Sequence, residues 1–161
     1  MVEEGTIKLP KTDNKNPELS ILVEGMGHIN FAQFMIDRKG ITDRVTLNGM
    51  TLMDWQTYLL PLDEKFITNL KPKYPEGVQD GVFYKGDFSL AETGDTYFDM
   101  SKYTRGVVYV NGHNLGRFWN VGPQQRLYCP ASWLKKGKNE IVGFDLLQNK
   151  AATVEGKREL E

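Results

Sequence analysis

Two short segments of the chain repeat one another, and each carries an Asn-Gly pair between two apolar runs. Val45–Leu52 aligns with Val108–Leu115, with the Asn-Gly pairs at 48–49 and 111–112. Asn and Gly both tolerate positive φ, which the two central positions of a type I′ turn require. The segments therefore predict two β-hairpins, and this constrains the chain towards a fold built from antiparallel strands.

The rest of the chain has the same character. Short runs rich in β-branched and aromatic residues follow one another, each bounded by Gly, Pro, Asn or Asp, which is typical of strands and tight turns. They lie at 19–23, 43–47, 50–58, 81–84, 96–100, 106–110, 117–119, 125–129 and 140–147. Helical periodicity occurs only at Leu62–Leu70, just after Pro61. We therefore expect an all-β sandwich of roughly nine strands with at most one short helix.

A length of 161 residues suits one ordinary domain or two small ones. The polar stretch 1–18 is expected to be a lead-in loop or linker. The strand-like runs place the sandwich over 19–147, which leaves 148–161 as a C-terminal tail or last strand.

Charge and cysteine content exclude several functions. A net charge of −1 gives no electrostatic reason to bind nucleic acid or an anionic membrane. One cysteine and two histidines provide neither a disulfide nor an ordinary zinc site, and no phosphate loop or dinucleotide motif occurs, so no metal or cofactor is expected. Cys129 lies at a predicted strand end, where a buried, inert thiol is favoured over a nucleophile.

The carboxylates do not indicate a catalytic pair. A glycosidase needs two of them facing each other across the scissile bond, one with a raised pKa. Most acids here lie beside Lys, Gly or turn residues, which are solvated positions. Asp99 interrupts an apolar run, and a structural carboxylate that bonds a neighbouring loop is the favoured interpretation. No catalytic residue is therefore assigned.

One stretch combines aromatic rings with planar polar groups. Rings can stack on the apolar face of a sugar, and guanidinium or amide groups can bond its hydroxyls. The candidate carbohydrate-binding residues are Arg117, Phe118, Trp119, Asn120, Gln124 and Gln125, with His113 and Asn114 as weaker candidates. The alternative is that the tryptophans fill the core of a sandwich while the Arg and Gln groups tie down loops.

An ordered series of motifs resembles a known family. The stretches Asp95–Ser101, Arg105–Gly112, Asn114–Trp119, Gly122–Gln125 and Trp133–Ile141 resemble the C-terminal region of family 35 glycoside hydrolases, the β-galactosidases. Earlier stretches at 22–24, 37–41 and 45–49 are similar to the same region. Three positions depart from the pattern: His28 stands where Arg is more usual, Cys129 replaces an aliphatic residue, and Gly143 interrupts the last strand.

The resemblance implies a jelly-roll β-sandwich of the galactose-binding-like type. It also implies that the catalytic glutamates belong to a TIM barrel N-terminal to this region, and such a barrel takes about 250 residues. The expected partner is that catalytic barrel, with galactosides or other glycans as further ligands. The first hypothesis is a non-catalytic accessory sandwich of a β-galactosidase. The alternatives are an autonomous carbohydrate-binding module and a small self-sufficient hydrolase.

Overall fold

The protein is described by a computed structural model that covers residues 5–25, 27, 30–36, 38–71, 73, 81–148 and 150–160. The chain divides into two compact units, Met1–Tyr58 and Leu59–Glu161. The sequence prediction had placed one sandwich over 19–147. The division reflects where the larger sheets begin, at Val82, whereas the described residues up to 58 contain one pair of two-residue strands.

The first unit contains three short elements. These are the 3-10 helix η1 (Ala32–Ile36) and the two-residue strands β1 (Thr46–Leu47) and β2 (Met50–Thr51). The strands pair antiparallel, Leu47 with Met50, around the first Asn-Gly turn. Asn48 has φ 49° and Gly49 has φ 85°, which confirms the predicted hairpin.

Two other strand predictions in this unit are wrong. No strand covers 19–23, and β2 ends at Thr51 rather than continuing to Tyr58. A strand needs a hydrogen-bonded neighbour, and β1 and β2 have only each other among the described residues. His28, which departs from the family pattern, lies outside the described residues.

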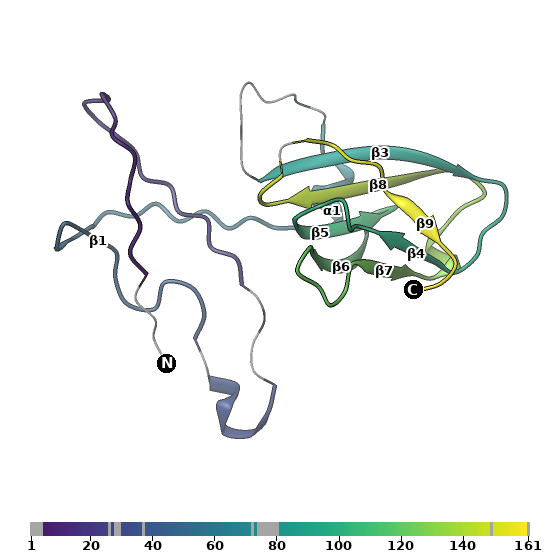
Figure 1. Ribbon diagram of the computed structural model, residues 1–161, viewed down its shortest axis with the longest axis horizontal. Coiled ribbons are helices and arrows are strands. Elements are labelled where there is room, and N and C mark those ends of the chain that lie inside the picture. Colours follow the sequence, from purple (N-terminus) through teal and green to yellow (C-terminus); the bar gives the residue numbers. More distant parts are fainter. Residues whose placement is uncertain are drawn as a thin grey trace. The chain divides into compact units, whose positions relative to one another are not determined.

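The second unit is an all-β sandwich of two antiparallel sheets (Figure 1). The larger sheet has the order β3-β8-β5-β6, from β3 (Val82–Leu90), β5 (Arg105–Val110), β6 (His113–Trp119) and β8 (Gly137–Asp145). The smaller sheet has the order β7-β4-β9, from β4 (Thr96–Asp99), β7 (Arg126–Cys129) and β9 (Glu155–Lys157). A 3-10 turn, η2 (Ala131–Trp133), joins β7 to β8. The predicted fold class is confirmed.

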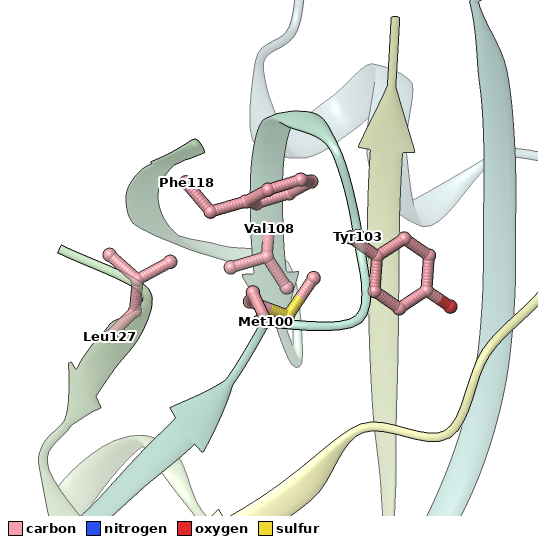
Figure 2. Packing of buried hydrophobic residues seen from close by; sticks show 5 residues of the cluster. All are labelled: Met100, Tyr103, Val108, Phe118 and Leu127. Atoms are coloured by element: carbon pink, nitrogen blue, oxygen red, sulfur yellow. The ribbon is translucent and has the colours of Figure 1, made fainter. Parts of the chain in front are cut away.

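The two sheets enclose the main core. Val108 of β5 and Phe118 of β6 pack with Leu127 of β7, and Met100 and Tyr103 complete the cluster from the β4–β5 connection. Figure 2 shows Met100 beside Val108, with the phenol oxygen of Tyr103 directed away from the other four side chains. That hydroxyl donates to the Ala152 carbonyl at 2.8 Å. The residues come from both sheets, so burial of this cluster stabilises the sandwich as a whole.

The opposite face of the larger sheet is covered by the short helix α1 (Glu64–Thr68). Asp63 caps this helix by accepting a hydrogen bond from the Phe66 N–H at 2.7 Å. Ile67 is fully buried against Val107, Tyr109 and Val142. The sequence predicted this helix, and its apolar spacing is explained by the sheet that it covers.

Gly106 sets how closely β5 can lie against β8. A Cβ atom at this position would stand 1.7 Å from the Phe144 carbonyl oxygen. Real Cβ atoms do not approach that closely, so only glycine fits. Gly143, which departs from the family pattern, is looser: a Cβ there would meet only the Met100 methyl carbon at 3.9 Å.

The second Asn-Gly hairpin joins β5 to β6. Asn111 has φ 51° and Gly112 has φ 88°, with Val110 paired to His113, so this turn is also confirmed. The Asn111 amide nitrogen donates to the Trp133 carbonyl at 2.7 Å and to Asn139 Oδ1 at 2.8 Å. Its own oxygen accepts from the Glu140 N–H at 3.0 Å. The turn residue thereby ties the hairpin to the segment that enters β8.

Candidate carbohydrate-binding face

The predicted candidate residues lie along β6 and the loop that follows it. Side chains alternate between the two faces of a strand, so neighbours in sequence point in opposite directions. Phe118 is 2% exposed and belongs to the core between the sheets. Arg117 and Trp119 lie on the other face, because they pair in register with Val107 and Arg105. Phe118 therefore fills the core and cannot stack on a sugar, which corrects its assignment as a candidate binding residue.

Trp119 is the exposed ring of this face, at 39% exposure. The Arg105 guanidinium carbon lies 4.7 Å from the centroid of the ring, which is a cation–π contact. This contact covers part of the indole and orients it. Arg105 was not among the predicted site residues, and only the pairing of β5 with β6 brings it to Trp119.

Arg117 stands on the same face, near Tyr109. Burial raises the pKa of Tyr109, and the positive charge of Arg117 lowers it in part. The Tyr109 hydroxyl donates to the Leu62 carbonyl at 2.9 Å, which anchors the start of α1 to the sheet. Two guanidinium groups, those of Arg105 and Arg117, therefore lie on the face around Trp119, which is the side of the sheet that α1 covers in part.

The polar residues of the β6–β7 loop mainly hold the loop together. The Gln125 side chain donates to the Asn120 carbonyl at 2.8 Å, and the Gln124 side chain donates to the Arg126 carbonyl at 3.3 Å. The Asn120 N–H bonds the Thr104 carbonyl at 2.8 Å. The side-chain amides of Gln124 and Gln125, which were predicted to bond a sugar, thus already have backbone partners.

His113 and Asn114 lie at the opposite end of β6. The His113 ring stacks on Trp133 with centroids 4.7 Å apart, and Asn114 Oδ1 accepts from the Gly116 N–H at 2.7 Å. Six residues of strand, about 20 Å, separate this end from Trp119. The structure therefore brings together Arg117 and Trp119, with Arg105, and separates them from His113 and Asn114.

The distinctive carboxylates of the sandwich have structural partners. Asp99 Oδ1 accepts from the Ser101 N–H at 3.0 Å, and Asp99 Oδ2 accepts from Arg126 Nε at 3.2 Å. The hydrogen bonds from Ser101 and the contact with Arg126 hold the pKa of Asp99 below its ordinary value. Asp145, which is buried, accepts backbone hydrogen bonds from Thr104, Leu147 and Gln148. The structural role expected for Asp99 is confirmed.

Cys129 is fully buried in the core. Burial, with a smaller contribution from the Asp95 charge, raises the pKa of its thiol to about 11. At neutral pH the group is therefore a protonated thiol and not a nucleophile, which confirms the prediction of an inert cysteine.

Two features are absent from the part of the chain that the structure describes. In that part of the chain, no three His, Cys, Asp or Glu side chains gather closely enough to hold a metal ion. No helix there has the length and apolar character needed to cross a membrane.

Two segments of the chain match known protein families. Residues 81–139, which include most of the sandwich, match the family described as the β-galactosidase galactose-binding domain. Residues 1–62 match the family described as the first all-β domain of β-galactosidase. The fold and the two matches therefore define a class of all-β domain named for β-galactosidases. These two segments belong to the domain families of β-galactosidases, and the resemblance noted from the sequence motifs is confirmed.

Individual relatives agree. The chain is 37% identical over 146 residues to Beta-galactosidase 1 of Dictyostelium discoideum, covering 84% of this chain and 22% of that protein. It is 35% identical over 133 residues to human Beta-galactosidase-1-like protein 2, covering 79% and 21%. It is 38% identical over 115 residues to the Beta-galactosidase of Xanthomonas manihotis, covering 71% and 19%. The chain thus spans about a fifth of the length of the relatives that it matches.

Proposed function

We propose that this chain acts as a non-catalytic accessory region of a β-galactosidase and packs on its catalytic barrel. The observation that carries the proposal is the surface of the first unit. Of the residues from 5 to 58 whose side chains are described, none is buried. Large apolar side chains there are 73% to 86% exposed, namely Ile7, Phe31, Ile36, Met53 and Tyr58.

Exposed apolar side chains in such number favour a protein partner. The second unit buries its own apolar residues between two sheets and beneath α1, so it does not need a partner to form a core. The side chains of the first unit that the structure describes form no such core. The relatives indicate what kind of partner this is, because about four-fifths of each relative lies outside the matched segment. We therefore expect the exposed apolar side chains of the first unit to pack on the rest of such an enzyme.

Binding to the remainder of a relative tests this role. The chain is mixed with Beta-galactosidase 1 of Dictyostelium discoideum from which the matching segment has been deleted, and complex formation is measured by ultracentrifugation. We expect Ile36→Asp and Met53→Asp to weaken the complex at least tenfold. Val121→Asp is the matched control, because Val121 is also 71% exposed but lies in the second unit. No complex, or equal losses from all three variants, would overturn the docking role.

The activity of the chain alone tests the second part of the proposal. Asp99 and Asp145 both have structural hydrogen-bond partners. We therefore expect the chain alone to hydrolyse a chromogenic β-galactoside no faster than a buffer blank. Turnover that survives repurification and disappears in Asp99→Asn would instead support the small self-sufficient hydrolase.

A second candidate function is carbohydrate binding at the face around Trp119. It is favoured by a partly exposed indole held by Arg105, with Arg117 on the same face. A single stacked ring with few hydroxyl bonds corresponds to millimolar affinity, about −4 kcal/mol. Titration with galactose, followed by backbone amide shifts, should give saturable changes around 116–126. Trp119→Ala should abolish them while the fold persists; a flat titration would leave only the docking role.

A further inference from the structure

The smaller sheet has an outer face that the sequence motifs did not identify. Phe98, Leu127 and Cys129 of β4 and β7 are buried towards the larger sheet. By strand alternation, Tyr97, Asp99, Arg126 and Tyr128 point the other way. β9 adds Glu155 and Lys157 to the same face, since they pair in register with Asp99 and Tyr97.

The side chains of this outer face form two rows across the three strands. One row is Tyr128, Tyr97 and Lys157, and the other is Arg126, Asp99 and Glu155. The rows are two residues apart along each strand, a spacing of about 7 Å. The tyrosine rings lie 5.5 Å apart between centroids and are tilted by 51°. A sugar ring stacked on the aromatic row would therefore present its hydroxyl groups to the charged row.

The exposed ring of Tyr128 is fixed in place. Its hydroxyl donates to Asp95 Oδ2 at 2.9 Å, and Asp95 Oδ1 accepts from the Ala131 N–H at 2.9 Å. The hydrogen bond to Asp95 raises the pKa of Tyr128. The ring is 45% exposed although its orientation is held at both ends, so little conformational entropy would be lost on binding.

The charged row offers both donors and acceptors with little net charge. Arg126 pairs with Asp99 at 3.2 Å through Nε and donates to the Leu160 carbonyl at 2.9 Å through Nη1, which leaves Nη2 for a ligand. Glu155 pairs with Lys102 at 3.1 Å and with Lys157 at 2.5 Å. A shallow pocket at the edge of the rows is lined by Arg126, Lys157, Arg158 and Glu159. Paired, planar charges beside a pocket suit hydroxyl groups, which both donate and accept, better than they suit a charged ligand.

From these features we infer that the outer face of the β7-β4-β9 sheet is a second saccharide site, which binds a neutral oligosaccharide along the tyrosine row. It lies on the other side of the sandwich from the face around Trp119, because Arg117 and Trp119 point away from the smaller sheet. The inference does not depend on docking to a catalytic barrel or on binding at Trp119, so each can fail separately.

Binding by the full chain tests the inference. The probes are a neutral β-1,4-linked galactotetraose and an acidic tetragalacturonate of equal length, and affinity is measured by calorimetry. We expect the neutral probe to bind, and Tyr128→Ala to weaken it at least tenfold. Tyr128→Phe, which keeps the ring and loses the bond to Asp95, should weaken it about threefold. Arg126→Gln should also weaken it, through loss of a donor.

Two controls make the result decisive. Trp119→Ala removes the candidate ring on the far side, so binding of the neutral probe that persists in this variant and is lost in Tyr128→Ala belongs to the outer face of the smaller sheet. Lys138→Gln removes an exposed ion pair with Asp87 on the larger sheet and should have no effect. Equal or tighter binding of the acidic probe would overturn the neutral ligand, and absence of binding would overturn the site. A loss in Trp119→Ala equal to that in Tyr128→Ala would assign the sugar to the other face.

Discussion

The two Asn-Gly hairpins have the same turn and very different surroundings. In both, Asn and Gly take positive φ at the two central positions. In the first hairpin each strand contributes two paired residues. A Cβ atom added at Gly49 would have no heavy atom within 4 Å. The second lies under α1, where a Cβ on Gly112 would meet Glu64 Cγ at 3.0 Å and Thr68 Cγ2 at 3.2 Å.

The comparison shows that the Asn-Gly motif determines the backbone of the turn, whereas the packing around the turn depends on the rest of the fold. Turn residues fix the local backbone, and that is enough for sequence reasoning to find both hairpins. They do not supply a neighbouring strand, a helix above the turn, or partners for the asparagine side chain. The same local signal therefore belongs in one case to a surface ribbon and in the other to the core, and substitutions at matched positions can measure the contrast.

The largest effect is expected at Gly112. Gly112→Val forces a β-branched residue into positive φ and drives its side chain into α1. Backbone strain and overpacking each cost about 1–3 kcal/mol, so the free energy of unfolding of the second unit should fall by about 2 kcal/mol or more. Chemical denaturation followed by tryptophan fluorescence measures it. A loss below about 1 kcal/mol would mean that α1 does not press on the turn.

The next effect comes from the asparagines. Asn111→Ala removes hydrogen bonds to Trp133, Asn139 and Glu140 and leaves buried groups unpaired, which should cost about 2–3 kcal/mol. Asn48→Ala places alanine in the same backbone conformation and serves as the matched control. Subtracting one loss from the other isolates the side-chain network, and equal losses would contradict its importance.

A smaller effect is expected at Gly49. Gly49→Val carries the same backbone strain, about 1 kcal/mol, but it meets no neighbouring atom. Hydrogen exchange should therefore become faster at residues 45–52 alone. If the melting midpoint of the second unit falls as well, the two hairpins are coupled and the comparison fails.

The smallest effect concerns pH and belongs only to the second unit. The pKa of Asp99 is lowered, so its carboxylate stabilises the fold above its ordinary pKa of about 4, and this contribution is lost as the pH falls through the folded pKa. Asp99→Asn should therefore melt at a lower temperature than the natural protein at pH 6. The gap should narrow at pH 2.5, whereas parallel melting curves at the two pH values would contradict the role of this carboxylate.

The sandwich was predictable because its signals are local. Alternating apolar residues, turn residues and the Leu62–Leu70 spacing identified β4, β5, β7, β8, α1 and both hairpins. The strands predicted at 19–23 and 52–58 failed for a tertiary reason: apolar runs form strands only where a neighbour supplies hydrogen bonds, and these runs have none in the described structure.

The candidate sites were harder to predict than the fold. The motif at 116–126 grouped residues by sequence, but strand alternation sends Phe118 inwards and Trp119 outwards. Arg105 joins Trp119, and Tyr97 joins Tyr128, only through the pairing of strands distant in sequence. Because side chains alternate between the two faces of a strand, the sequence alone could have placed Phe118 and Trp119 on opposite faces. The register between strands could not be obtained from one sequence.

The reactivity of the single cysteine can be used to measure how often the sandwich opens. Cys129 is fully enclosed between the sheets, so a thiol reagent added from solvent can reach it only when the sandwich opens. When closing is fast relative to labelling, the observed rate is the intrinsic thiol rate multiplied by the fraction of open molecules. The modification rate under native conditions would then give the free energy of opening of the core directly, without denaturant, and from the one sulfhydryl in the chain.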